Sequence, residues 1–222
     1  IGYQGKKLEE LEGLSATEKA NMLFIVQDPY TSYYDAKVVR DFVALAQKLG
    51  FEPILLPFKP NGKAMHIKGF LTRFSKTAKT QAEFLNRVAK LNVPLVGVDP
   101  AIVLSYRDEY KEALGDSRGD FHVLTAHEWL TNQLESNALQ SAVKNIAKSD
   151  RTFEWHLFPH CTESTFMPNS PKEWQNIFAQ FGQTLNVEKI GCCGMAGVFG
   201  HEVQNQTMSK DIYDVSWGKK LQ

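Results

Sequence analysis

Short apolar runs alternate with amphipathic helical patterns along most of the chain, and this alternation limits the folds open to it. Because strands that alternate with helices form parallel sheets covered by helices on both faces, the sequence predicts an α/β fold with small parallel sheets flanked by helices. The expected strands are 22–26, 53–57, 95–98, 121–124, 153–158 and 187–190. The expected helices are 35–50, 70–91, one through Tyr110, one or two more up to Lys148, and 171–181, with a glycine-bearing loop at 60–69.

The overall composition excludes several classes of protein. Lysine plus arginine (25) equals aspartate plus glutamate (25), so no net charge attracts nucleic acid. No apolar run approaches the roughly 20 residues of a membrane-spanning helix, and three cysteines in 222 residues do not make a secreted disulfide framework. We expect a cytoplasmic protein without a membrane span, with peripheral attachment at the inner membrane as a second option.

Both ends of the sequence suggest a piece of a longer polypeptide. The first residue is Ile1 rather than methionine, and 217–222 reads as a helix that has no capping signal. Residues 1–20 are charged and polar, which predicts a linker or a peripheral helix.

The three cysteines follow two consecutive predicted strands. Cys161 follows the strand at 153–158, and Cys192 and Cys193 follow the strand at 187–190 in a glycine-rich turn. Neighbouring cysteines are too close to satisfy disulfide geometry easily. The carboxyl ends of parallel strands lie at one edge of a sheet, so the three thiols are expected together there. Thiolates bind soft metals and clusters, and the sequence therefore predicts a metal site formed by Cys161, Cys192 and Cys193.

A closed thiolate site usually has four ligands, so this set is one ligand short. His160 and His201 flank the thiols and are candidates for the fourth ligand or for hydrogen-bond donors to the sulfur of the centre. Glu163 and Glu202 are weaker candidates for the same roles. The thiolate chemistry alone permits zinc as well as iron–sulfur. Buried structural thiols and a redox-active thiol pair are the remaining alternatives.

The strand–helix–strand pattern occurs twice with similar spacing, which predicts two Rossmann-like sub-domains related by internal duplication. We expect the first at 21–150 and the second at 151–222. Tyr30 precedes Pro60 by 30 positions, and Cys161 precedes Cys192 by 31. The first sub-domain then has Tyr30, Pro60 and Asn61 in place of thiols.

Two groups of motifs resemble a known family. The segment Gly191-Cys192-Cys193-Gly194-Met195-Ala196-Gly197, with Phe199-Gly200-His201-Glu202 and Tyr213-Asp214-Val215-Ser216, is similar to its second-half signature. Val98-Asp99-Pro100 with Tyr106-Arg107-Asp108-Glu109-Tyr110 is similar to its first-half segment. The family is the cysteine-rich CCG domain of heterodisulfide-reductase-like proteins. From about Met22 onward the chain most resembles the C-terminal portion of large fused FAD-linked oxidases of the D-lactate and D-2-hydroxyglutarate dehydrogenase type.

This resemblance implies an iron–sulfur protein that transfers electrons. Cys161, Cys192 and Cys193 would hold a cluster, expected to be 4Fe-4S, and the family's last cysteine would fall beyond Gln222. Ile102 stands where many members carry cysteine, so all four first-half ligand positions lack sulfur. FAD and a ferredoxin-like domain would lie elsewhere in the same polypeptide. Electrons would pass from a D-2-hydroxy acid to a quinone or another acceptor, and this piece alone is expected to be inactive and without its cluster.

Two other functions are alternatives to electron transfer. The first is a metal-free structural or interaction module that packs on the flavin domain, which the absence of cysteine from the first half favours. The second is nucleotide binding by the glycines at 191, 194, 197 and 200, but the Gly-x-Gly-x-x-Gly fingerprint is absent.

Overall fold

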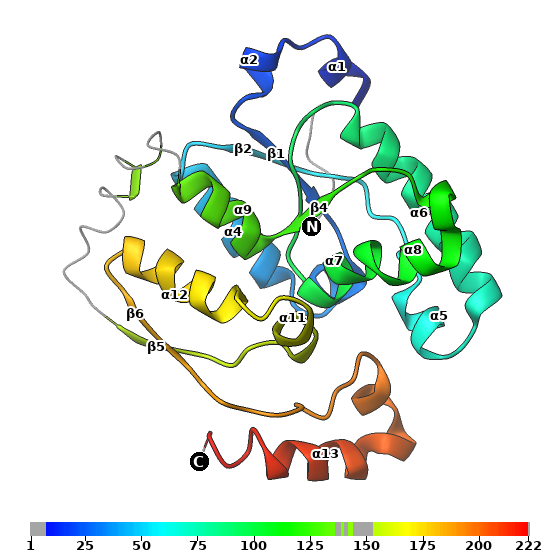
Figure 1. Cartoon of the computed structure of the whole chain (residues 1–222), viewed down its shortest axis with the longest axis vertical. Coiled ribbons are helices and arrows are strands. Elements are labelled where there is room, and N and C mark those ends of the chain that lie inside the picture. The colour runs from blue at the N-terminus through cyan, green and yellow to red at the C-terminus, as the bar shows by residue number, and fades with distance from the viewer. Residues whose placement is uncertain (1–7, 136–138, 140–141, 144–152, 222) are drawn as a thin grey trace.

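A computed structural model describes residues 8–135, 139, 142–143 and 153–221 of the chain. Its centre, with helices on both sides, is a four-stranded sheet (Figure 1). The sheet is fully parallel, and its strand order is β2-β1-β3-β4. A second parallel sheet pairs β5 with β6. The α/β prediction with small parallel sheets flanked by helices is confirmed. The strands are β1 (Met22–Val26), β2 (Glu52–Leu55), β3 (Leu95–Gly97), β4 (Val123–Thr125), β5 (Glu154–Leu157) and β6 (Thr184–Val187).

Strand β1 is buried on both faces because helices cover both sides of the four-stranded sheet. Met22, Phe24 and Val26 point into one apolar cluster, which α6, α7 and α8 complete. Leu23 and Ile25 point into the other cluster, which contains side chains of α4 and α9. These helices are α4 (Ala36–Lys48), α6 (Leu71–Ala89), α7 (Pro100–Arg107), α8 (Glu109–Leu114) and α9 (Ala126–Leu134).

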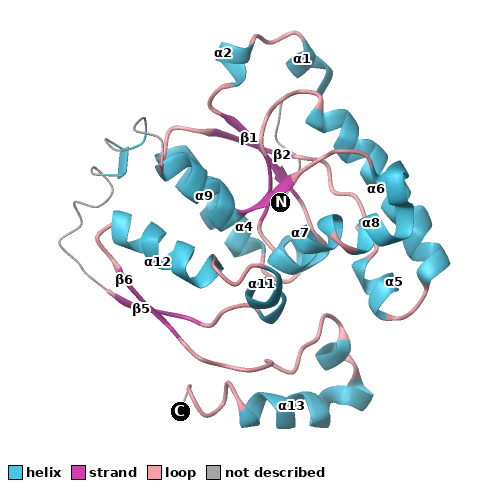
Figure 2. Cartoon of the chain, in the orientation of Figure 1, coloured by secondary structure: helices cyan, strands magenta, loops and turns pink. Residues whose placement is uncertain are grey.

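The two-stranded sheet lies apart from the central one, and α12 (Ser170–Gln180) packs between α9 and β6 (Figure 2). Ile177 of α12 is buried in the same apolar cluster as Trp129 of α9. Strand β5 is largely exposed, and Trp155 is 46% accessible. The short helix α11 (Cys161–Phe166) follows β5 and packs on α7.

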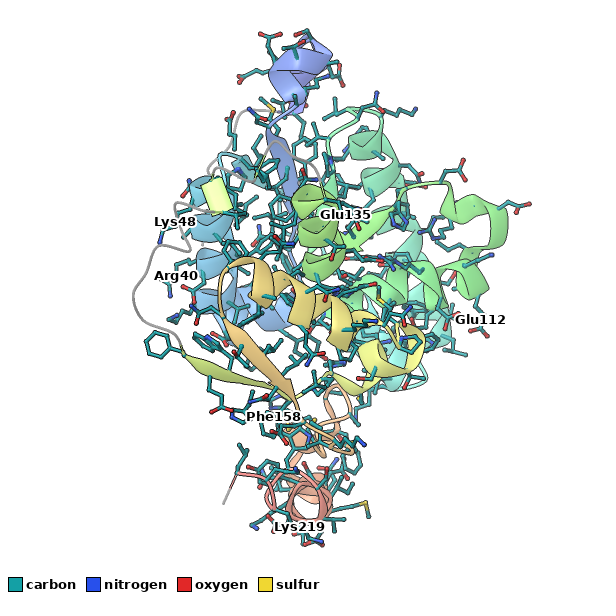
Figure 3. The ribbon with its side chains drawn as sticks, turned by 60° about the vertical axis from the view of Figure 1, so that its left-hand side comes forward. Arg40, Lys48, Glu112, Glu135, Phe158 and Lys219 are labelled. Carbon is teal, nitrogen blue, oxygen red and sulfur yellow. The ribbon has the colours of Figure 1, made fainter. Side chains whose placement is uncertain are left out.

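The two end regions are short helices and turns. α1 (Leu8–Glu12) and α2 (Ala16–Lys19) precede β1, and Leu11 anchors α1 in the core. At the other end, η3 (Phe199–His201), η4 (Val203–Asn205) and α13 (Gln206–Val215) follow the cysteine turn. Figure 3 shows Phe158 where the chain leaves β5, and its ring lies 5.0 Å from that of Trp217. Among the described helices, none has the length and hydropathy needed to cross a bilayer.

Several element boundaries differ from the sequence-based prediction. The strand expected at 187–190 is β6, three residues earlier, because Gly182 ends α12 in a left-handed conformation (φ 69°) and the chain enters the sheet at once. The strand expected at 121–124 begins at Val123, because the side chains of Asn86 and Arg118 bind the backbone of Phe121.

Four further corrections concern helices. The loop expected at 60–69 contains α5 (Lys63–Ile67), which starts after the left-handed Gly62. The helix expected to pass through Tyr110 breaks at Asp108 into α7 and α8, and the 3₁₀ turn η1 (Gly115–Arg118) follows them. The helix expected at 217–222 is absent from 216–220, where the chain forms turns after Val215. The short helix α3 (Pro29–Tyr33) lies between the strand expected at 22–26 and the helix expected at 35–50, where no helix was expected.

The division into domains stays a prediction. Much of the junction expected near residue 150 lies outside the described residues, as does most of the helical region expected between 136 and Lys148.

Candidate thiol site

Cys161 is the first residue of α11 and is exposed. It follows β5 by four positions, so it lies beyond the carboxyl end of the small sheet. His160 caps the helix, and its Nδ1 accepts a hydrogen bond from the backbone N–H of Thr162 at 3.2 Å. His160 is therefore occupied by local structure, although it also borders the hollow described below.

Cys192 and Cys193 lie in the loop after β6, at the same edge of the small sheet. Gly194, with φ of 84°, turns the chain there, and its backbone N–H donates to Cys192 Sγ at 3.3 Å. Ser209 of α13 holds the turn, because its hydroxyl donates to the Gly194 carbonyl at 2.9 Å. Before the cysteines, Ser216 Oγ accepts from the Gly191 N–H at 2.6 Å. The turn is thus fixed to the C-terminal helix and the residues after it.

The three thiols border two adjoining hollows that share Cys161. Cys193 and Cys161 line an open hollow of about 510 Å³, and Cys192 and Cys161 line a second one of about 650 Å³. Within the described residues, no three His, Cys, Asp or Glu side chains are grouped so as to hold a metal ion. The structure thus brings the three predicted residues to one sheet edge, where Cys192 and Cys193 line different hollows and Cys161 lines both.

The first of these hollows, which we name the thiol hollow, is also lined by residues of the thiol-free half. Tyr30, Lys63 and Asp99 contribute from α3, α5 and the start of α7. Burial raises the pKa of Tyr30, and the negative charges of Asp99 and Asp28 raise it further. Tyr30 therefore stays protonated at neutral pH. Lys63 forms an ion pair with Glu109, and both side chains are mostly buried.

Sequence reasoning missed Lys63 as a residue of the site. It occurs in a basic stretch that reads as a solvated surface, and its spacing to the cysteines carries no signal. Only the packing of α5 against the second half places it at the thiol hollow.

The other candidate ligands have partners of their own. His201 borders the thiol hollow and stacks on Tyr34, with ring centroids 5.5 Å apart. Glu202 pairs with Lys68. Glu163 is buried and accepts a hydrogen bond from Trp174 Nε1 at 3.2 Å, while its Oε1 lies 3.3 Å from His127 Nδ1. Glu163 thus ties α11 and α12 to α9.

One constant spacing relates the two halves. In the first half the register pairs Met22 of β1 with Glu52 of β2, and in the second it pairs Glu154 of β5 with Thr184 of β6. The paired residues are the same distance apart in sequence in both β–α–β units. The left-handed glycines correspond as well, since Gly62 and Gly194 differ by 132 positions and so do Gly50 and Gly182. The N-caps Asp28 and His160 obey the same difference. By this spacing the position in the first half that is equivalent to Cys161 is Pro29. The sequence-based prediction gave Tyr30 as the equivalent residue, so it is corrected by one position.

Comparisons with known proteins relate the chain to one named enzyme. It is 80% identical over 221 residues to D-2-hydroxyglutarate dehydrogenase of Haemophilus influenzae, which covers 100% of the chain and 22% of that protein. The proteins of the same name from Escherichia coli and Pseudomonas putida are 56% and 38% identical over 215 and 211 residues, covering 97% and 95% of the chain. The chain spans about a fifth of the length of these relatives. No family model matches the chain. No solved structure matches it.

Proposed function

We propose that this chain is the C-terminal iron–sulfur electron-transfer module of an FAD-dependent D-2-hydroxyglutarate dehydrogenase. The names of the relatives support the dehydrogenase and its substrate, and favour D-2-hydroxyglutarate over D-lactate. The observation that supports the electron-transfer role is that the strands preceding the cysteines end at one sheet edge, where Cys161 lines one hollow with Cys193 and a second with Cys192. In this proposal FAD and a ferredoxin-like domain lie elsewhere in the polypeptide, and a quinone or another acceptor takes the electrons. The location stays a proposal too: cytoplasmic, or peripheral at the inner membrane.

The donor chemistry fits an iron–sulfur cluster. Cys161, Cys192 and Cys193 would hold it, and a fourth ligand would come from outside the described residues or from His160 or His201. When bound, a cluster supplies a site that takes up and releases single electrons. The chain's own residues prepare the thiols for this role. Gly194 donates its N–H to Cys192 Sγ, which stabilises negative charge on that sulfur, and Ser209 keeps the turn in place.

The proposal is tested on the full-length polypeptide, purified without oxygen. We expect iron and acid-labile sulfide, a visible absorption that D-2-hydroxyglutarate bleaches, and a paramagnetic signal after reduction. In the Cys161→Ser protein this module's share of iron and signal is expected to be lost, while the flavin spectrum remains. Full-length protein that has FAD and oxidises substrate, but whose iron content does not depend on these cysteines, would refute the electron-transfer role.

A metal-free interaction module is the second candidate function, and the exposed apolar side chains favour it. Tyr33, Tyr34 and Phe153 are 70%, 74% and 52% accessible, which indicates surfaces suited to packing against another domain. This candidate predicts that serine at each cysteine leaves iron content and substrate-dependent electron flow unchanged. The same measurements therefore separate the two functions.

A further inference from the structure

The thiol hollow has two chemically different walls. One wall carries the thiols of Cys161 and Cys193 and the thioether of Met195. The opposite wall comes from the half without cysteine and carries the phenol of Tyr30, the ammonium of Lys63 and the carboxylate of Asp99. The hollow therefore joins soft sulfur ligands to a hydrogen-bond donor and a cation from the other half.

Tyr30 extends its hydroxyl towards the cysteine turn. The hydroxyl oxygen lies 3.9 Å from the position that a Cβ on Gly197 would take. Within the part of the chain that the structure describes, no hydrogen bond satisfies this hydroxyl, and its ring has Tyr34 as a neighbour at 6.4 Å. A protonated phenol has one donor to offer. The Tyr30 hydroxyl is therefore free to donate to a group bound in the hollow.

Lys63 brings positive charge to the same space. The 132-residue spacing pairs it with Met195, and both side chains line the thiol hollow. Where the thiol-bearing half has an uncharged thioether, the thiol-free half thus has an ammonium. An ion pair with Glu109 keeps the Lys63 ammonium in place. The side chains of Lys63 and Glu109 are only 15% and 17% exposed, so solvent screens the charge of Lys63 less than it screens a surface charge.

We propose that the thiol-free half tunes the thiol centre, with Lys63 and Tyr30 as positioning residues that stabilise its more negative, reduced form. This inference rests on the proposed electron-transfer function. A nearby cation and a hydrogen bond to sulfur both favour the state with the extra electron, and so raise the reduction potential. The half without cysteines has a role in this way, because it forms the opposite wall of the site.

The test is a redox titration of the full-length polypeptide, followed by the paramagnetic signal of the cluster. Lys63→Met removes the cation and copies the residue at Met195. We expect it to lower the ratio of reduced to oxidised cluster about tenfold at a given potential, a shift of about 59 mV for a one-electron couple.

Glu109→Gln leaves the lysine uncompensated and is expected to shift the potential upward. The double variant Lys63→Met/Glu109→Gln restores the net charge and is expected to lie between the single variants. Tyr30→Phe is expected to lower the potential.

Binding of cobalt(II) to the metal-free polypeptide provides a readout that needs no cluster. Sulfur-to-cobalt charge-transfer absorption reports thiolate ligation. Because Lys63 repels a dication, Lys63→Met is expected to bind cobalt(II) several-fold more tightly, and Glu109→Gln more weakly. Lys59→Met and Tyr33→Phe are the matched controls, because Lys59 lies over the Phe84 ring and Tyr33 against Phe58, and neither is among the residues that line the two hollows.

The outcomes separate the two claims. A wild-type polypeptide without thiolate–cobalt absorption and without a cluster signal overturns the proposed function and this inference together. A wild-type protein that binds both, while the Lys63 and Glu109 variants match the controls in potential and cobalt affinity, overturns only the tuning role. Opposite shifts in the two single variants, with the controls unchanged, support it.

Discussion

Gly62 and Gly194 turn the chain in the same left-handed conformation, with φ of 81° and 84°, at equivalent points of the two halves. Each follows the end of a strand, and each is close to a longer helix that comes after it, α6 for Gly62 and α13 for Gly194. A Cβ on Gly62 would lie 2.9 Å from the Phe74 ring, and one on Gly194 would lie 2.2 Å from the Ser209 carbonyl oxygen. The same backbone turn thus serves a half with thiols and a half without them.

Gly194→Ala is expected to lower the free energy of unfolding by about 2 kcal/mol or more, from left-handed strain and overlap with backbone. Chemical denaturation measures this loss. Gly182→Ala is the control, because Gly182 is also left-handed (φ 69°) but has open space around a new Cβ. It should cost about 1 kcal/mol. Equal losses in the two variants would show that the contact with Ser209 has no effect.

His127→Leu is expected to destabilise the packing of α11 and α12 on α9. His127 is 1% exposed, and its Nδ1 lies 3.0 Å from Thr125 Oγ1 and 3.3 Å from Glu163 Oε1. Its Nε2 lies 3.2 Å from Glu173 without the alignment of a hydrogen bond. Leucine leaves the buried Glu163 with one partner fewer, which costs about 2–3 kcal/mol. Thermal unfolding measures the change. Glu173→Gln, at a partly exposed carboxylate, is the control and should cost less than half as much.

Glu128→Gln is expected to flatten the dependence of stability on pH in the acid range. Burial alone would raise the pKa of Glu128, but hydrogen bonds from Arg107 and from the Thr125 backbone together lower it below its ordinary value. A carboxyl with a lowered folded-state pKa stabilises the fold above its unfolded pKa of about 4.3 and loses this contribution as the pH falls through the folded value. Denaturation between pH 7 and pH 3 tests this. A glutamine variant with the wild-type acid slope would contradict it.

Among the three cysteines, Cys161→Ser is expected to reduce iron content more than Cys192→Ser or Cys193→Ser. Cys161 borders both hollows, whereas each of the others borders one. Iron and sulfide assays on full-length protein, with a correctly folded variant confirmed by circular dichroism, provide the measurement. The ranking fails if serine at position 192 or 193 removes at least as much iron.

Periodicity was sufficient to predict most of the elements. The buried run 22–26 and the helical pattern at 70–91 appear as β1 and α6, because β1 is buried on both faces and α6 has one broad apolar face. Boundaries set by single side-chain contacts were not predictable. Asn86 and Arg118 hold the backbone of Phe121 from 35 and 3 positions away, and nothing in the local sequence indicates that β4 starts after them.

The site divides in the same way. The sequence alone determined that Cys161, Cys192 and Cys193 follow adjacent parallel strands, because the order of strands along the chain sets which ends share a sheet edge. Only the tertiary structure decided that Cys192 and Cys193 line different hollows, and that Lys63 and Tyr30 line the one that holds Cys193. These relationships depend on how the elements around the four-stranded sheet pack against those around the two-stranded sheet. Contacts between distant segments leave no period in a sequence, so the partners of the thiols appear only when the chain is folded.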